Sequence, residues 1–333
     1  MKRFGFALGV IVALVAVLCM AQTYITDTGQ NWRLTGTVLE NCKFTGSLAI
    51  NTGGNTYYVD GNMADDNGDG LTWTTAYQKL TTALAASHAN IALTVQRGWA
   101  WRNVIYVRGD EITENFTKGA QRTDIVGVGS TNQHNKPRII GTWIIEAQTE
   151  NDYMGMRFFN VQLQDDGAGG AIFLSPINQC NGLEFHECKF ISQVTDTIGI
   201  QLGGVHDVVI DNCEFQPNTS GVGFSASAIK IVDGAGALTN VRISNCRIWS
   251  ASIGIDWDET SNINCWILDN FFNTGGMCID SEDVTGVLIA GNRMKTALGS
   301  ADNTSNDFNV IWGVDNIVTG SSDTIYIPSP ADF

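Results

Sequence analysis

The sequence predicts an all-β fold: a right-handed, single-stranded parallel β-helix in which coils of three short strands stack into a solenoid. A corner motif predicts it first, because EFHECKF (184–190) returns as VVIDNCEF (208–215) and VRISNCRI (241–248), with VLENCKF (38–44) as an outlying copy. Units that recur after 20 to 50 residues are typical of solenoids. Composition agrees, since 333 residues include 36 Gly and only 16% charged residues, which suits short strands and turns.

The corner motif predicts a sharp bend with an inward-facing ladder beside it. The position of its cysteine is occupied by Val161, Cys188, Cys213, Cys246, Asn270 and Asn292, with Cys42 as an outlying member. The residue before each is Asn160, Glu187, Asn212, Asn245, Asp269 and Gly291. Asn, Asp and Gly tolerate positive φ, so one left-handed residue is expected at each corner. Glu187 is the exception, and we expect it to be strained or differently turned.

A second strand precedes each corner unit. It reads TIGIQL (197–202), SAIKIV (227–232), ASIGID (251–256) and GMCID (276–280), with apolar residues two apart. Parallel crossovers of this kind are almost always right-handed. A helix at about 75–88 is expected to cap one end of the solenoid, with Leu80, Ala83 and Leu84 on one face. Thr75 and Gln78 fit a capping box.

The N-terminal segment predicts export. Residues 1–21 contain Lys2, Arg3 and a long apolar run, and they are interpreted as a secretory signal cleaved after Ala21. We therefore expect a secreted, extracellular or periplasmic protein with no membrane attachment after cleavage. Residues 22–56 form an N-terminal segment with one coil-like unit, 57–295 the β-helix, and 296–333 a C-terminal tail.

The net charge argues against one class of partner, and the cysteine spacing argues against one metal. The formal charge of −15 argues against nucleic acid, because phosphate backbones would be repelled. Of eight cysteines, Cys19 lies in the signal segment, and the remaining seven show no CxxC spacing. A packing role is therefore expected for them, and zinc is not.

Three segments near the start of the solenoid resemble a known superfamily. They are YYVDGNMADDNGDGLTWTTAYQKLTTAL (57–84), NVIYVRGDEITEN (103–115) and IVGVGSTNQHNKPRIIG (125–141). With the corner units, they look like right-handed parallel β-helix proteins of the pectate-lyase-like superfamily. The resemblance implies a substrate groove on the outer face of the strand upstream of the corner. It does not choose an activity, since the superfamily includes lyases, glycosidases, epimerases, phage tailspikes and adhesins.

Acidic residues gather on that strand and in the turn after it. Alternation places Asp256 and Asp280 in one outward column with Val232, and Lys230 in a neighbouring column with Gly254 and Cys278. The turn adds two further pairs, Asp258 with Glu282 and Glu259 with Asp283. Stacked carboxylates either raise one another's pKa or recruit a cation.

Two kinds of chemistry follow from these acids. Asp256 and Asp280 could bind Ca²⁺, as in pectate lyases that bridge a uronate, with Lys230 as the base of a lyase. Alternatively, the two carboxyl groups could perform glycoside hydrolysis. Trp257 and Trp266 could supply stacking faces for sugar rings. The bland alternative is that the acids are turn residues and the Trp side chains pack inward.

A further calcium candidate lies in DDNGDG (65–70). Asp65, Asn67 and Asp69 are spaced like the start of an EF-hand loop, but Ala76 stands where a bidentate Glu is required. A turn before a helix explains the segment without metal. Calcium is thus the one cofactor that the sequence suggests.

The leading hypothesis is an exported β-helix that binds a polysaccharide or cell-surface glycan on its outer face, as a surface or virion protein. The first alternative is a Ca²⁺-dependent polysaccharide lyase or a glycoside hydrolase that uses Asp256, Asp280 and Lys230. The second is an adhesin or architectural subunit without ligand chemistry. A homotrimer is compatible with each, and the virion surface is the alternative location.

Overall fold

The computed structural model describes most of the chain between residues 54 and 319. The described ranges are 54–93, 101–129, 136–144, 154–167, 170–175, 181–193, 197–218, 223–232, 238–249, 251–259, 261–281, 286–296, 302–303, 311–312 and 317–319. The chain divides into two compact units, Met1–Leu48 and Ala49–Phe333, and all described residues belong to the second. The expected signal segment and the Cys42 corner lie outside them. In the described ranges, no helix has the length and apolar character needed to span a membrane.

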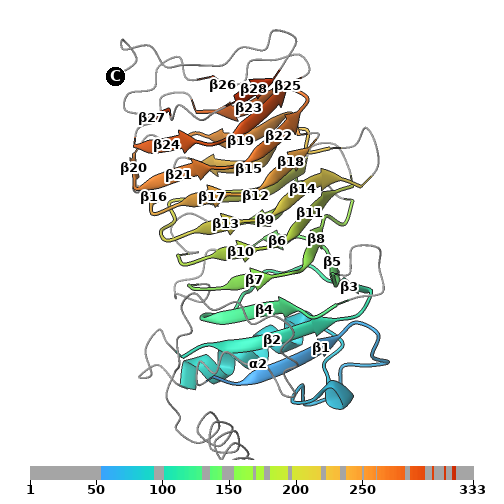
Figure 1. Ribbon diagram of the computed structural model, residues 1–333. Helices are drawn as coiled ribbons and strands as arrows, with labels where there is room; N and C mark the ends of the chain where they lie inside the picture. The colour runs from blue at the N-terminus through green and yellow to red at the C-terminus, as the bar shows by residue number, and fades with distance from the viewer. Residues whose placement is uncertain are drawn as a thin grey trace, which may run out of the picture. The chain divides into compact units, whose positions relative to one another are not determined.

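Three parallel sheets run along the stack of coils (Figure 1). We call them sheets A, B and C. Sheet A contains β1 (Thr56–Asp60), β2 (Asn103–Arg108), β4 (Thr123–Gly127), β7 (Arg157–Phe159), β10 (Glu184–His186), β13 (Val209–Asp211), β17 (Arg242–Ser244), β21 (Cys265–Leu268), β24 (Val287–Ala290) and β27 (Ile311–Trp312). Sheet B contains β3 (Glu111–Thr113), β5 (Arg138–Ile140), β8 (Gln162–Gln164), β11 (Lys189–Ser192), β14 (Glu214–Pro217), β18 (Arg247–Trp249), β22 (Phe271–Thr274), β25 (Arg293–Thr296) and β28 (Ile317–Thr319).

Sheet C completes each coil. It contains β6 (Trp143–Ile144), β9 (Gly170–Leu174), β12 (Thr197–Gly203), β15 (Ser227–Val232), β19 (Ile253–Trp257), β23 (Met277–Asp280) and β26 (Asp302–Asn303). A short parallel pair, β16 (Leu238–Thr239) and β20 (Asn262–Ile263), precedes sheet A in two coils. The chain visits A, B and C in turn and pairs each strand with its equivalent in the next coil, so the parallel β-helix is confirmed. Strands β26, β27 and β28 carry all three sheets beyond residue 295.

The corners between sheets A and B follow the predicted pattern. Positive φ angles of 52° to 69° occur at Asn160, Glu187, Asn212, Asn245, Asp269 and Gly291. Glu187 has a φ of 54°, the same as Asn160, so of the two expectations the strained one holds and the one that it turns differently is wrong. The stacked corners above and below impose the left-handed conformation even on a residue type that seldom adopts it.

The ladder beside these corners is buried and hydrogen-bonded. The thiols of Cys188 and Cys213 donate to backbone carbonyls of the preceding coil, at 3.5 Å and 3.4 Å. Farther along, Asn270 accepts from the backbone N–H of Cys246 at 2.9 Å and donates to Asn292 Oδ1 at 3.1 Å. The described cysteines are buried free thiols, which confirms the predicted packing role for them. Burial raises the pKa of Cys213 well above its usual value.

Aromatic rings fill the interior of the coils. Phe158 stacks on Phe185 with centroids 4.9 Å apart, and Phe190 stacks on Phe215 at 4.7 Å. All four side chains are fully buried. Like side chains thus repeat at the spacing of parallel strands, so each coil buries its apolar residues against the next.

A second set of left-handed corners, not predicted from the sequence, lies just before the strands of sheet A. Its members are Arg122, Gly155, Gly182, Asp207, Asn240, Asn264 and Gly286. All except Arg122 are Gly, Asp or Asn, so the residue types that predicted the first set of corners also occur here. At Gly286 a Cβ atom would lie 2.2 Å from the carbonyl oxygen of Asn262, so only glycine fits there.

The capping helix α2 spans Leu80–Leu93, so it begins after the predicted start at residue 75. Leu80, Ala83 and Leu84 are buried in the core, as expected. The capping box of Thr75 and Gln78 is wrong, because Thr75 ends a short 3₁₀ helix, η1 (Trp73–Thr75). The caps come from farther away: Asp66 accepts from the backbone N–H groups of Gln78 and Lys79, and Glu114 from those of Leu80 and Thr81. These carboxylates also favour the positive end of the helix dipole.

Asp165 provides a test of how burial of a carboxylate affects stability. Its buried side chain accepts hydrogen bonds from Gln193 N at 2.6 Å and Thr197 Oγ1 at 3.3 Å. Burial raises its pKa, and these hydrogen bonds oppose the rise. A raised folded pKa means that the folded state binds the proton more tightly, so stability falls as pH rises from 3.8 through the folded value.

Asp165→Asn removes this ionisation and is expected to raise the thermal midpoint relative to wild type at neutral pH. The difference should vanish below pH 3.8, where the wild-type group is protonated in both states. Thermal unfolding across pH measures this, with Asp65→Asn as the matched control, because Asp65 is exposed and is not among the charges that shift the pKa of Asp165. A difference that is independent of pH would contradict the prediction.

Candidate functional site

A line of polar side chains crosses the outer face of sheet C. Gln201, Lys230, Asp256 and Asp280 occupy equivalent positions on β12, β15, β19 and β23. The neighbouring positions, such as Ile229, point into the core. We call these four residues the sheet C ladder. Adjacent members are separated by one strand spacing, about 4.8 Å.

Lys230 joins two coils of the ladder through ion pairs. Its Nζ lies 2.7 Å from Asp256 Oδ2 and 3.1 Å from Asp258 Oδ2. The side chain of Asp256 is 11% exposed, whereas that of Asp258 is 53% exposed. The structure therefore brings together three of the predicted site residues, with one cation between two carboxylates.

The pKa shifts in this cluster follow from its composition, in which two carboxylates share one ammonium group. Burial raises the pKa of Asp256, and the charge of Asp258 adds to the rise while Lys230 opposes it. Burial lowers the pKa of Lys230, but hydrogen bonds to Asp256 and Asp258 outweigh it, so the net shift is upward. One ammonium group cannot fully neutralise two carboxylates, so Asp256 is the group that most readily takes a proton. Lys230 is held in its charged form, which disfavours it as a general base.

The predicted register of the ladder needs a correction. Lys230 was expected in a column with Gly254 and Cys278, but it pairs with Asp256 instead. The inward residues set this register, because Ile231 pairs with Trp257. Cys278 is fully buried, and a Cβ atom at Gly254 would lie 2.6 Å from Cδ1 of Phe272, so both positions face the core.

The predicted aromatic faces are not available on sheet C. Trp257 is fully buried, and its Nε1 donates to Asn262 Oδ1 at 3.0 Å. It therefore cannot stack on a sugar ring. Trp266 is half-buried on β21, which belongs to sheet A. Glu259 is buried in the turn after β19, where its Oε1 accepts from Ser261 N at 3.0 Å.

Of the remaining predicted acids, only Asp280 lies among the described residues. Asp280 is half-buried and in register with Asp256. Glu282 and Asp283 lie outside the described residues. Among the described residues, no group of three or more His, Cys, Asp and Glu side chains is placed to hold a metal ion.

The Asp65, Asn67 and Asp69 segment makes local turn contacts. Asp65 Oδ1 accepts from Asn67 N at 3.1 Å, and Asp69 Oδ1 accepts from Leu71 N at 3.0 Å and from Thr75 Oγ1 at 2.5 Å. The hydrogen bond from Thr75 is the main cause that lowers the pKa of Asp69. These contacts shape the turn that leads into η1.

Outward-facing aromatic residues, not predicted from the sequence, occur on sheet A. Tyr58 and Tyr106 are in register on β1 and β2, with ring centroids 5.8 Å apart. Trp73 lies 4.8 Å from Tyr58, and the guanidinium of Arg108 lies 4.2 Å above the Trp73 ring. We call these four residues the sheet A aromatic cluster. The period-2 alternation of YYVD and NVIYVR was the signal that could have found it.

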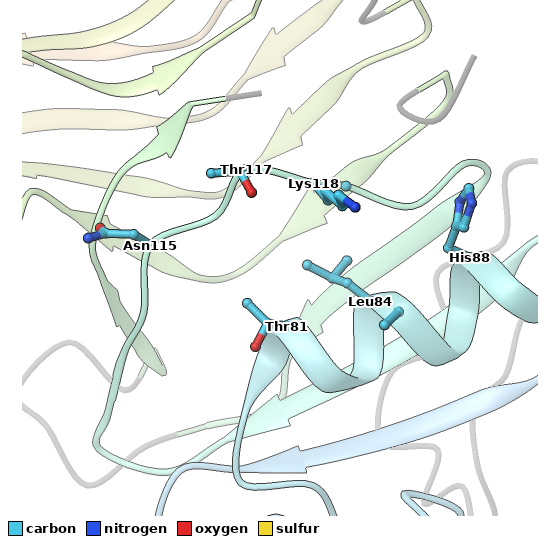
Figure 2. Close-up of a pocket in the computed structure, with 8 residues that line it drawn as sticks. Thr81, Leu84, His88, Asn115, Thr117 and Lys118 are labelled. Atoms are coloured by element: carbon cyan, nitrogen blue, oxygen red, sulfur yellow. The ribbon is translucent and has the colours of Figure 1, made fainter. Parts of the chain in front are cut away.

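A cavity of about 370 Å³ opens between α2 and the segment that follows β3 (Figure 2). Thr81, Leu84 and His88 line it from the helix. Asn115, Thr117 and Lys118 are among the residues that line it from the other side. No sequence pattern predicted this cavity, because its walls are about thirty residues apart and meet only through the fold.

Comparison with known proteins adds no family: no protein-family model matches the chain, and no curated protein matches it in sequence.

Proposed function

We propose that this protein is exported and binds carbohydrate on the outer face of sheet C, in a surface or virion structural role. The observation that carries the proposal is the Lys230 ammonium group on β15, held by Asp256 and Asp258 of the next coil. With Gln201 and Asp280 in the same ladder, it presents donors and acceptors in one line. A polysaccharide offers hydroxyl groups in a matching linear repeat.

The pairing of charges within the ladder favours recognition over simple solvation. The carboxylate of Asp256 is mostly buried and oriented by Lys230, so little side-chain entropy is lost when a hydroxyl group binds to it. Hydrogen bonds to such charged groups are stronger than those between neutral groups. The sheet supplies a rigid base for these contacts.

We propose that Ca²⁺ bridges anionic glycans to the protein. The chain carries a formal charge of −15, so a uronate polymer would be repelled unless a cation bridged it to the protein. Asp256 and Asp280 supply oxygen ligands of the kind that Ca²⁺ prefers.

A second candidate function, glycoside hydrolysis, is favoured by the raised pKa of Asp256. A carboxyl group that keeps its proton can act as a general acid, with a second carboxyl group such as that of Asp258 nearby. A lyase that uses Lys230 as its base is the weaker enzymatic alternative, because two carboxylates hold Lys230 charged. The third alternative is an architectural subunit, as a homotrimer or an adhesin, that neither binds nor cleaves glycans.

One experiment separates these functions. The purified chain is incubated with uronate-rich and neutral polysaccharides, with calcium or with a chelator. Ultraviolet absorbance reports unsaturated ends, a reducing-sugar assay reports hydrolysis, and a pull-down reports retention. We expect retention without turnover. Unsaturated ends would indicate a lyase, reducing ends alone a hydrolase, and no signal in any of the three assays would reject carbohydrate as the partner.

The sheet A aromatic cluster offers a second contact surface for sugar rings. Tyr106→Ala removes one of its rings, and we expect polysaccharide retention to weaken about threefold to tenfold, as for loss of one aromatic contact of about 0.5–1.5 kcal/mol. Affinity electrophoresis measures this. Trp249→Ala is the matched control, because Trp249 is exposed on sheet B. An equal loss in both variants would indicate nonspecific adsorption to aromatic residues.

A further inference from the structure

The cavity beside the capping helix has the size and lining of a small-molecule site. Its volume of about 370 Å³ falls in the range of ligand pockets, which run from roughly 300 to 1,000 Å³. Leu84 forms part of an apolar floor, and hydroxyl groups of Thr81 and Thr117 border it. An apolar surface with a few convergent polar groups is typical of such sites.

The charge of the cavity differs from that of the whole chain. Among the described residues that line the cavity, Lys118 is a cation, the imidazole of His88 can donate a hydrogen bond, and none is Asp or Glu. Figure 2 shows Lys118 and His88 at the same end and Asn115 at the opposite end. In a chain with a formal charge of −15, this is a local site for an anion.

The helix N-terminus does not explain this preference. The backbone N–H groups of Leu80 and Thr81 are occupied by the carboxylate of Glu114, at 2.7 Å and 3.2 Å. That carboxylate is thereby engaged at the helix end. The attraction for an anion must come from the Lys118 and His88 end of the cavity.

The wall that carries Lys118 is fixed in place. Phe116 is buried and stacks on Trp143 with centroids 3.8 Å apart. Asn115 Oδ1 accepts from Thr142 N at 2.8 Å, and Ala120 N donates to Met156 Sδ at 3.4 Å. The cavity is therefore held open on both sides by the core, and little ordering is needed when a ligand enters.

We infer that this cavity binds a small hydroxylated carboxylate of the size of a sugar acid. The carboxylate lies between Lys118 and His88, and the ring lies over Leu84 with its hydroxyl groups toward Thr81 and Thr117. The site is separate from the sheet C ladder and does not depend on the proposed function there.

The test uses the full chain, with D-galacturonate as the probe and D-galactose as its neutral match. Isothermal titration calorimetry at fixed ionic strength is expected to show galacturonate binding at least tenfold more tightly than galactose. Lys118→Gln should weaken galacturonate binding about tenfold, as for loss of one charge-assisted contact. Lys79→Gln, an exposed lysine outside the cavity, should leave it unchanged.

A variant that fills the cavity tests whether galacturonate binds inside it. Ala85 is exposed on α2 and lines the cavity, so Ala85→Trp can occupy the space without entering the core. We expect it to abolish galacturonate binding and to keep the thermal midpoint. Absence of galacturonate binding to wild type, equal binding of galactose or inorganic phosphate, or an equal loss in Lys79→Gln would each overturn the inference.

Discussion

Phe272→Ala is expected to lower the free energy of unfolding by about 3–5 kcal/mol, the range for loss of a buried phenyl ring. Phe272 is fully buried on β22, where its ring lies against the backbone of β19 at Gly254. The stacked coils above and below cannot collapse into the space without breaking strand pairing, so the cavity should persist. Chemical denaturation measures the change.

The neighbouring Phe271 supplies the control. It lies on the same strand, is 38% exposed and faces outward. Phe271→Ala is expected to change the free energy of unfolding by at most about 1 kcal/mol. Equal effects at the two positions would show that the inward and outward faces of sheet B are assigned wrongly.

The corner geometry was predictable because the restriction is local. An Asn, Asp or Gly before every member of the ladder except Cys188 indicated a left-handed residue, and all six positions, Glu187 included, have positive φ. The repeat therefore predicted the coil and the buried ladder. The second set of corners, from Arg122 to Gly286, carried the same signal, because all its members except Arg122 are Gly, Asp or Asn. It was not predicted, because no repeated cysteine marks the position beside it.

The register of sheet C could not be derived from the sequence. The loop between β14 and β15 is longer than its neighbours, so the alternation of β15 alone did not reveal which residue stands opposite Asp256. The side chains that face the core decide it: Ile231 pairs with the buried Trp257, and this places Lys230 beside Asp256. The ion pairs and the loss of Trp257 as a stacking face both follow from that register.

Lys230→Gln is expected to weaken polysaccharide retention about tenfold to a hundredfold, if carbohydrate binds to the sheet C ladder as proposed. A hydrogen bond to a charged group contributes about 1.5–3 kcal/mol, and each 1.4 kcal/mol corresponds to a factor of ten. The substitution also frees Asp256 and Asp258 to repel each other, so their oxygen atoms no longer hold a fixed geometry. Affinity electrophoresis in a polysaccharide gel measures the change.

Lys295→Gln isolates the role of position from the role of charge. Lys295 is exposed on the outer face of sheet B, so its substitution alters the net charge of the chain by the same amount as that of Lys230. If retention depended only on overall charge, the two variants would weaken it equally. If the fixed arrangement of Lys230 between two carboxylates is what the glycan recognises, only Lys230→Gln will do so, and added salt will not restore binding because the lost contact is short-range.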